Sequence, residues 1–335
     1  MGTPVSQPLF GDAIDLAQPR LGSEVVFATD DFFADKSRLI SPGEPVWIDD
    51  KYDDYGKWMD GWESRRKRDE GHDYCIVKLG VPGVIFGVVV DTRFFTGNFP
   101  PHASLEACVS HDKIPDDSTD WVEIVSKQAL KGDNRQHFRV ENDTQFTHVR
   151  LHIYPDGGIA RLRIYGEIQP DWSRFDPLVP IDLLSLQHGG RALACNDEHY
   201  GSMRNLNAPG RGVNMGDGWE TARRRTPGND WVVMALGHPG TIEAIEVDTA
   251  HFKGNYPDRV MLQATLVPAG ESPDIDSSDQ WPILLGEHKL SMDTQHYFID
   301  DINDIGPISH VRMNIYPDGG ISRLRIIGRL YQPTD

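Results

Sequence analysis

The chain has 335 residues, of which 39% are hydrophobic and 25% are charged. This length and composition predict a folded protein of two ordinary domains. Its 51 acidic and 33 basic residues give a formal net charge of −18, which argues against nucleic acids and anionic membranes as partners.

No apolar run approaches the ~20 residues of a membrane-spanning helix. The start of the chain lacks the pattern of a secretion signal, and its cysteines, Cys75, Cys108 and Cys195, lack metal or disulfide spacing. We therefore expect a cytoplasmic protein.

Short strands are predicted along the first half of the chain. After residues 1–23, interpreted as an N-terminal extension, short apolar runs occur at 75–79, 84–90 and 121–125. Residues 149–153 and 161–164 alternate between apolar and polar side chains, as strands with one buried face do. Residues 155–158, Pro-Asp-Gly-Gly, separate these two segments, which predicts a β-hairpin with a tight turn. No segment has a long, clean helical period.

The second half of the chain repeats the first. Asp-Gly-Trp-Glu-Ser at 60–64 returns as Asp-Gly-Trp-Glu-Thr at 217–221, and Gly-Asn-Phe-Pro at 97–100 returns as Gly-Asn-Tyr-Pro at 254–257. The longest match pairs residues 148–164 with 310–326. We therefore predict one repeat at 24–168, a linker at 169–190 and a second repeat at 191–330. The short strands with Gly and Pro between them predict an all-β fold of two tandem jelly-roll-like β-sandwich domains.

The predicted hairpin gathers polar side chains. His148 and Arg150 share one face of their strand, and Arg161 and Arg163 should point to the same side from the adjacent strand. The corresponding residues of the second repeat are His310, Arg312, Arg323 and Arg325. Clustered guanidinium groups need either an anionic ligand or carboxylates of their own domain. The sequence leaves both interpretations open.

A second set of charged residues surrounds the Asp-Gly-Trp-Glu motif. Glu63 precedes a run of cations that includes Arg66, and Glu220 and Arg223 take these positions in the second repeat. Cations beside Glu63 are expected to keep its carboxylate ionised. The alternative interpretation is a solvated run of charge, which is favoured for Arg65 because Ala222 replaces it.

A metal site has little support in the sequence. His148 and His152 could face one ion, but Arg150 lies between them and Asn314 replaces the second histidine in the other repeat. No metal-hydrolase motif is present. We therefore predict no metal and no cofactor, and a divalent ion at His148 remains the alternative.

The order of these motifs, given twice, resembles the allantoicase family from about Glu24 to about Leu330. The motifs are Asp-Gly-Trp-Glu-[Ser/Thr] before an Arg run, Gly-Asn-[Phe/Tyr]-Pro, and Ile-Tyr-Pro-Asp-Gly-Gly-Ile-x-Arg-Leu-Arg. The resemblance implies hydrolysis of allantoate to ureidoglycolate and urea, a step of allantoin and purine degradation that recovers nitrogen. It also implies two jelly-roll domains similar to galactose-binding and discoidin-like modules, and assembly as a homo-oligomer.

Site residues are assigned from the chemistry of allantoate, which carries one carboxylate and two ureido groups. Arginines would bind the carboxylate, and a histidine with Asp or Glu would transfer protons to the leaving urea. The binding set is Arg150, Arg161, Arg163 and Arg66, with Arg312, Arg323, Arg325 and Arg223 in the second repeat. The catalytic set is His148, Asp156 and Glu63, with His310, Asp318 and Glu220 in the second repeat.

Three alternatives to this function remain at the level of sequence. The first is a non-catalytic tandem β-sandwich protein that binds carbohydrate or another ligand, since a fold does not determine a function. The second is the metal-dependent enzyme that releases ammonia from allantoate, whose ligands and mixed α/β scaffold are not visible in this sequence. The third is a diverged pseudoenzyme of allantoicase ancestry.

Overall fold

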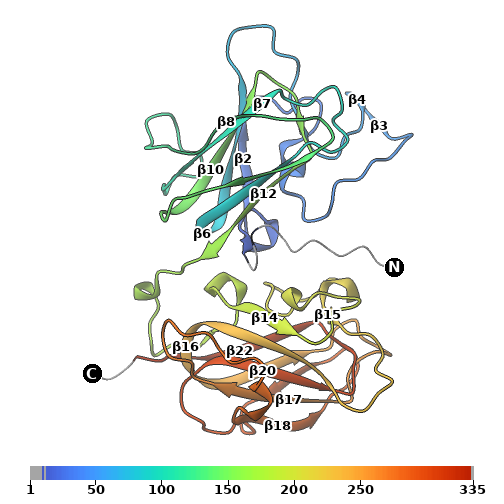
Figure 1. Cartoon of the computed structure of the whole chain (residues 1–335), viewed down its shortest axis with the longest axis vertical. Helices are drawn as coiled ribbons and strands as arrows, with labels where there is room; N and C mark the ends of the chain where they lie inside the picture. The colour runs from blue at the N-terminus through green and yellow to red at the C-terminus, as the bar shows by residue number, and fades with distance from the viewer. Residues whose placement is uncertain (1–9, 11–12, 333–335) are drawn as a thin grey trace. The chain divides into compact units, whose positions relative to one another are not determined.

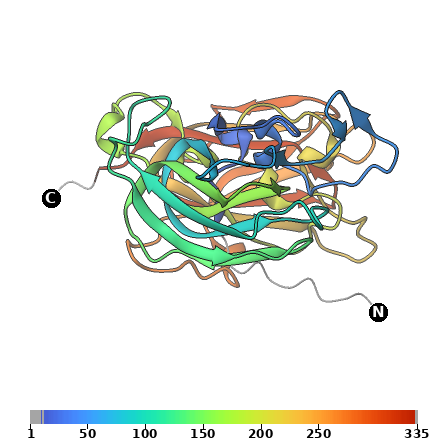
Figure 2. The same ribbon diagram turned by 90° about the horizontal axis from the view of Figure 1, so that it is seen from above.

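The computed structural model describes residue 10 and residues 13–332. Regular structure in these residues consists of strands and short 3-10 turns, and the chain divides into two units, residues 1–169 and 170–335 (Figure 1). The same strand-rich character is visible from a second direction (Figure 2). Within the described residues, no helix has the length and hydropathy needed to cross a membrane. The predicted all-β fold of two tandem domains is confirmed.

Two antiparallel layers form the first unit. One contains β2, β6, β10, β7 and β8, and the other contains β9, β6, β12 and β1. The strands are β1 (Ile14–Asp15), β2 (Glu24–Ala28), β6 (Asp73–Asp91), β7 (His102–Cys108), β8 (Val122–Ala129), β9 (Arg135–Arg139), β10 (Gln145–Tyr154) and β12 (Arg161–Ile168). The alternating residues Val149, Leu151 and Ile153 of β10 are fully buried between the layers, as their pattern predicts.

The long strand β6 belongs to both layers because it folds back on itself. Its first half pairs with β10 and its second half with β12. Asp73 N donates to Pro155 O at 3.0 Å and Ala160 N donates to Asp91 O at 2.8 Å. The five steps along the chain from residue 155 to residue 160 span at most about 18 Å, whereas β6 as a straight strand would measure roughly 60 Å. Both ends of β6 therefore lie at the same end of the sandwich.

The second unit repeats this topology. Its sheets contain β14, β16, β20, β17 and β18, and β19, β16, β22 and β13. The strands are β13 (Ile181–Asp182), β14 (Arg191–Cys195), β16 (Asp230–Asp248), β17 (Arg259–Thr265), β18 (Ile283–Lys289), β19 (Gln295–Phe298), β20 (Ile308–Tyr316) and β22 (Arg323–Leu330). β1 and β13 pair within the sheets of their units, although they lie in segments that the sequence analysis assigned to the N-terminal extension and the linker.

The predicted hairpin between β10 and β12 was wrong. Both strands pair with β6, but with different halves of it, so they lie in different layers. The chain between them forms β11 (Gly158–Ile159), which pairs with β5 (Trp62–Glu63) rather than closing a turn. The turn-like composition of 155–158 therefore marks a crossing between two sheets. His148 and Arg150 consequently do not share a face with Arg161 and Arg163.

The motif tryptophan anchors the loop that follows β2. Trp62 is fully buried, and its Nε1 donates to Asp30 O at 2.8 Å. Trp219 makes the same bond to Asp197 O, also at 2.8 Å, in the second unit. The indole thus fixes the same loop in each repeat, which explains why both copies contain this residue.

Replacing Trp62 by Phe is expected to lower the free energy of unfolding by about 2 kcal/mol, because it leaves a small cavity and removes the hydrogen bond to Asp30. Chemical denaturation followed by circular dichroism measures this loss. Trp47, which is 45% exposed, provides the control, and Trp47→Phe should leave the unfolding curve unchanged. Equal stability of the two variants would contradict the anchoring role.

Candidate active site

The repeated motifs meet at one end of each sandwich. In the first unit, β5 pairs with β11, so Glu63 lies opposite Gly158. Asn98 of the Gly-Asn-Phe-Pro motif donates through Nδ2 to Glu63 Oε1 at 2.7 Å and accepts through its carbonyl from Gly158 N at 2.7 Å. In the second unit, Asn255 makes the same side-chain bond to Glu220. Three segments distant in sequence therefore build one cluster in each repeat.

Asp156 holds the cationic segment in place. Its Oδ2 accepts from Lys67 N at 2.8 Å, and Asp318 accepts from Arg224 N at 2.9 Å in the second unit. The next residue, Gly157, has φ +140°, and a Cβ atom there would lie 2.6 Å from Pro100 N, so only glycine fits. Asp156 and Asp318 were predicted to transfer protons, but these bonds give each carboxylate a clear positioning role.

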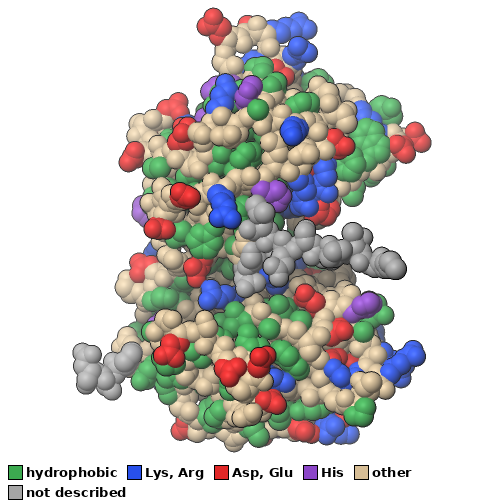
Figure 3. Space-filling model, viewed as in Figure 1, with side chains coloured by type: hydrophobic (Ala, Val, Ile, Leu, Met, Phe, Trp, Pro, Cys, Tyr) green, Lys and Arg blue, Asp and Glu red, His purple; other side chains and the backbone are tan. Residues whose placement is uncertain are grey.

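A cavity of about 690 Å³ lies beside this cluster in the first unit. A second cavity of about 520 Å³ shares lining residues with it, among them Asp30, Phe33 and Arg65. The larger cavity is lined by Thr29, Asp30, Phe33, Arg65, Arg66, Lys67, Arg68, Asp69 and Asp73. Acidic and basic side chains are interspersed on the face shown in Figure 3, so attraction of an anion depends on such local groups rather than on the net charge.

Within the cationic segment, two side chains are paired and two are available. Arg65 pairs with Asp30 at 2.6 Å, and Lys67 pairs with Asp73 at 2.6 Å. Arg66 and Arg68 are exposed, and neither forms a hydrogen bond or ion pair with another described residue. These two guanidinium groups can therefore bind an anion in the cavity without breaking an internal contact.

The repeats differ around this cavity. Ala222 replaces Arg65, so the ion pair to the loop aspartate is confined to the first repeat. The connection from 30 to 60 spans 30 positions, whereas its counterpart from 197 to 217 spans 20. The additional length contains a hairpin of β3 (Tyr52–Asp53) and β4 (Gly56–Lys57), and Tyr55 at its tip lines the smaller cavity. The first repeat thus has a wall that the second repeat is too short to build.

Burial acts on the Glu63 carboxyl against the effect expected of the neighbouring cations. Burial raises the pKa of this carboxyl, and the hydrogen bond from Asn98 offsets this only in part. The neighbouring cations were expected to keep Glu63 ionised, but desolvation of the buried carboxyl is the largest effect on its pKa. A carboxyl with a raised pKa holds its proton to a higher pH than an exposed glutamate does, which is the property required of a proton donor.

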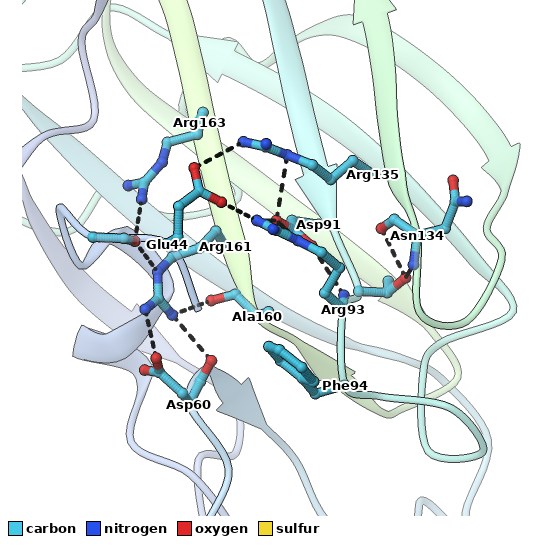
Figure 4. Close-up of polar contacts among 12 residues, drawn as sticks. Glu44, Asp60, Asp91, Arg93, Phe94, Asn134, Arg135, Ala160, Arg161 and Arg163 are labelled. Atoms are coloured by element: carbon cyan, nitrogen blue, oxygen red, sulfur yellow. Dashed lines mark hydrogen bonds and ion pairs between the residues drawn. The ribbon is translucent and has the colours of Figure 1, made fainter. Parts of the chain in front are cut away.

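Arg161 and Arg163 clamp a loop on the outer face of the other sheet (Figure 4). Arg161 is 3% exposed and pairs with Asp60 at 2.8 Å. It also donates to the carbonyls of Arg38, Gly43, Asp60 and Ala160. Arg163 donates to the carbonyls of Pro42 and Gly43.

The second repeat contains the same clamp. Arg323 pairs with Asp217 at 2.8 Å and donates to Gly210 O, and Arg325 donates to the carbonyls of Ala208 and Gly210. Of the two interpretations left open by the sequence, pairing within the domain describes these arginines.

Arg150 and Arg312 lie on the outer faces of the β10 and β20 sheets. Arg150 pairs with Glu106 and Asp117, both at 2.6 Å, and lies 4.3 Å from the ring centroid of Trp121. Arg312 donates to Ser278 Oγ at 2.6 Å and lies over Trp231. Both guanidinium groups therefore already have partners.

His148 lies at the far end of β10 from the motif cluster. It is buried, its Nδ1 lies 2.9 Å from Thr147 Oγ1, and its Nε2 has no hydrogen-bond partner. Six residues of β10 and Pro155 separate it from Asp156, a distance of roughly 25 Å along the chain. Burial lowers the pKa of His148 and lowers that of His310 to about 4. Across the described part of the chain, no three His, Cys, Asp or Glu side chains are grouped to hold a metal ion.

The predicted site residues are thus divided among three places. Glu63, Asp156 and Arg66 lie in or beside the motif cluster. Arg150 and His148 lie on the outer face of the β10 sheet, and Arg161 and Arg163 lie on the outer face of the β12 sheet. Asn98 was not among the predicted site residues, although the repeated motif that contains it is visible in the sequence. Nor was the row of His72, His152 and Glu106 predicted, in which His72 Nε2 lies 2.8 Å from His152 Nδ1 and His152 Nε2 lies 3.0 Å from Glu106 Oε2.

Comparison with known proteins identifies the family. A sequence model of the allantoicase repeat matches residues 14–169 and 181–331. The chain belongs to the allantoicase family. It is 56% identical over 320 residues to a probable allantoicase of Photobacterium profundum, covering 95% of this chain and 97% of that protein. It is 55% identical over 325 residues to a probable allantoicase of Pseudomonas aeruginosa, covering 97% and 98% of the two chains.

A solved structure agrees with this assignment. The crystal structure of allantoicase from Saccharomyces cerevisiae is 39% identical, with a TM-score of 0.79 over 94% of this chain and 93% of that chain. The two matches to the allantoicase repeat each include the short first strand, β1 or β13, of the corresponding sandwich. Each β-sandwich is therefore one allantoicase repeat.

Replacing Arg161 by Ala is expected to lower the free energy of unfolding by about 3–5 kcal/mol, because it leaves Asp60 and several loop carbonyls buried without a partner. Arg323→Ala should cost a similar amount in the second allantoicase repeat. Thermal and chemical denaturation measure both losses. Exposed Arg139 is the control position, and an Arg161→Ala variant as stable as Arg139→Ala would refute the clamping role.

The raised pKa of Glu63 predicts a pH-dependent stability. The folded state holds the Glu63 proton more tightly than the unfolded state, so this contribution is present below the unfolded pKa and lost as pH rises through the folded pKa. Glu63→Gln keeps an acceptor for Asn98 and removes the charge. We expect the wild type to lose stability relative to Glu63→Gln as the pH rises above about 4, the ordinary pKa of a glutamate in an unfolded chain.

The measurement is the free energy of unfolding as a function of pH for the wild type, Glu63→Gln and the exposed control Glu141→Gln. The control should follow the wild type. Parallel curves for all three proteins would show that Glu63 has the same pKa in both states, contrary to the expected effect of its burial.

Proposed function

We propose that this protein hydrolyses allantoate to ureidoglycolate and urea, a step in the degradation of allantoin that recovers nitrogen. The observation that carries the proposal is the match to allantoicases at more than 50% identity over almost the whole chain. In this reaction the oxygen of water bonds to the central carbon, one C–N bond breaks, and the departing urea nitrogen gains a proton.

The chemistry of the motif cluster is suited to this reaction. Arg66, exposed in the larger cavity, is assigned to the substrate carboxylate, since guanidinium and carboxylate form paired hydrogen bonds. Asp30 and Asp69 line the same cavity and supply acceptors for ureido N–H groups. Glu63, whose pKa is raised by burial, is assigned to protonating the leaving nitrogen. The buried clamp arginines and Asp156 position the surrounding loops.

Three further properties are proposed with this activity. The reaction uses no cofactor, because the carboxyl and guanidinium groups of the cavity supply the acid and the anion site that it requires. The protein acts in the cytoplasm, which is supported by its three unpaired cysteines. It assembles as a homo-oligomer, as the family resemblance implies.

Incubation of the purified protein with allantoate tests the proposal. We expect urea and ureidoglycolate in equal amounts, no ammonia, and the same rate with and without a chelator. Release of ammonia, or no turnover at all, would overturn the proposed reaction. Turnover that is abolished by the chelator and restored by a divalent ion would overturn the cofactor proposal.

Matched variants of the two repeats test the assignment of the site. Arg66→Ala should lower kcat/KM about 30-fold, the loss expected when a charged hydrogen bond to substrate is removed. Arg223→Ala should change it less than about twofold within that scale, because the second repeat lacks Arg65 and the hairpin wall. Circular dichroism of both variants controls for folding. Equal losses would place a site in each repeat, and a loss confined to Arg223→Ala would reject the assignment.

A further inference from the structure

A second group of cations lies on the outer face of the β9–β6–β12 sheet of the first repeat (Figure 4). The strand register places Arg135, Asp91 and Arg161 side by side across three strands. Arg93 follows β6 and pairs with the buried Asp91 at 2.6 Å. Asp91 is close to both Arg93 and Arg135, with Arg135 Nε 3.6 Å from its carboxylate. Arg93 and Arg135 therefore share a single carboxylate of the sheet, that of Asp91.

Glu44 from the preceding loop supplies the additional negative charge. Its carboxylate accepts from Arg93 Nη2 and lies 3.4 Å from Arg135 Nη2. Partial burial acts to raise the pKa of Glu44, but the hydrogen bond from Arg93 and the charges of Arg135 and Arg163 hold it below its usual value. The Glu44 side chain is nevertheless 63% exposed. Ion pairs between exposed side chains are weak, so this carboxylate can be displaced at small cost.

The cation group also contains an unsatisfied donor. Arg163 is 7% exposed, and its Nη1 is buried without a hydrogen-bond partner, with the nearest carboxylate, Asp15, at 3.6 Å. Val89 is its neighbour on β6, whereas the corresponding residue of the second repeat is Glu246 beside Arg325. The first repeat therefore lacks a carboxylate that the second repeat supplies.

The second repeat contains no equivalent site among its described residues. Ala250 stands in place of Arg93 and Gln295 in place of Arg135. Arg211 stands in place of Glu44 and pairs with Asp248 at 3.0 Å. Arg211 of the loop neutralises Asp248 of the sheet, and the two positions that correspond to Arg93 and Arg135 carry no further cation. The surplus of cations is thus a property added to the first repeat rather than a requirement of the shared fold.

We propose that Glu44 occupies a carboxylate-binding site formed by Arg93, Arg135 and Arg163, and that a small carboxylate ligand displaces it. Planar carboxylates bind arginine pairs through parallel hydrogen bonds. The backbone at Gly43 stays fixed during the exchange, because Arg161 Nε and Arg163 Nη2 hold its carbonyl at 3.0 and 2.9 Å. Only the side chain of Glu44 has to swing into solvent. The site is separate from the cavity that contains Arg66.

Titration of the full-length protein with malonate, followed by calorimetry, tests this proposal. Removing the internal competitor should increase the fraction of protein with an open site, so Glu44→Gln should bind malonate about fivefold more tightly than the wild type. Adding Arg135→Gln, which installs the residue of the second repeat, should reverse this gain. The matched control is Arg211→Gln, which changes the corresponding loop residue and should leave malonate affinity unchanged.

A competition experiment identifies the source of the carboxylate. Ureidoacetate carries a carboxylate and one ureido group, whereas the proposed substrate carries a carboxylate and two ureido groups, and malonate carries no ureido group. Displacement of malonate from Glu44→Gln at lower concentrations of ureidoacetate than of acetate would assign the site to substrate-like ligands. Equal displacement would assign it to small carboxylates in general. Both results support a carboxylate site and do not depend on allantoate turnover.

If Glu44 serves only to tether the loop, Glu44→Gln will lower the melting temperature and bind malonate no better than the wild type. That result overturns the proposal. Unchanged malonate affinity on addition of Arg135→Gln to Glu44→Gln overturns it as well, because binding would then occur elsewhere.

Discussion

The long loop after β2 has few backbone partners of its own, and a buried arginine supplies them. Arg161 projects from the first position of β12 and donates to four carbonyls and to the carboxylate of Asp60. Burial of a guanidinium group is tolerated only when its donors are satisfied, and here the loop satisfies them. The loop is ordered by the arginine, and the arginine is stabilised by the loop. The hairpin wall of the proposed site and the Glu44 contact both belong to this loop and depend on its order.

Comparison of the two repeats distinguishes contacts that the fold requires from contacts that occur in only one repeat. The bonds that join Glu63 to Asn98 and Trp62 to the loop carbonyl recur in the second repeat through Glu220 and Trp219. They join segments that the backbone alone would leave apart, so both sandwiches need them. Their presence in two copies is therefore evidence for a structural constraint before it is evidence for catalysis.

In one row of side chains the two repeats keep the same hydrogen-bond pattern, but the second repeat has no charged members. His72, His152 and Glu106 form a row on the outer face of the β10 sheet. Asn229, Asn314 and Gln263 form the same row in the second repeat, with 3.1 and 3.0 Å between successive members. Amide side chains replace the ionisable ones, so this row keeps its hydrogen bonds in the second repeat but contains no titratable group. The first repeat is thus the chemically richer copy.

The sequence by itself determined the duplication, the all-β class and the buried faces of strands such as Val149–Ile153. It could do so because a repeat is found by direct comparison of the two halves of the sequence, and side-chain alternation is a property of neighbouring residues. Only the tertiary structure decided that β10 and β12 lie in different sheets, because that depends on β6 folding back to pair with both. For the same reason the sequence brought together His148 and Arg161, which the fold separates, and did not foresee Glu44 beside Arg93 and Arg135. Contacts between segments distant in sequence, rather than any local pattern, brought these three charged side chains together.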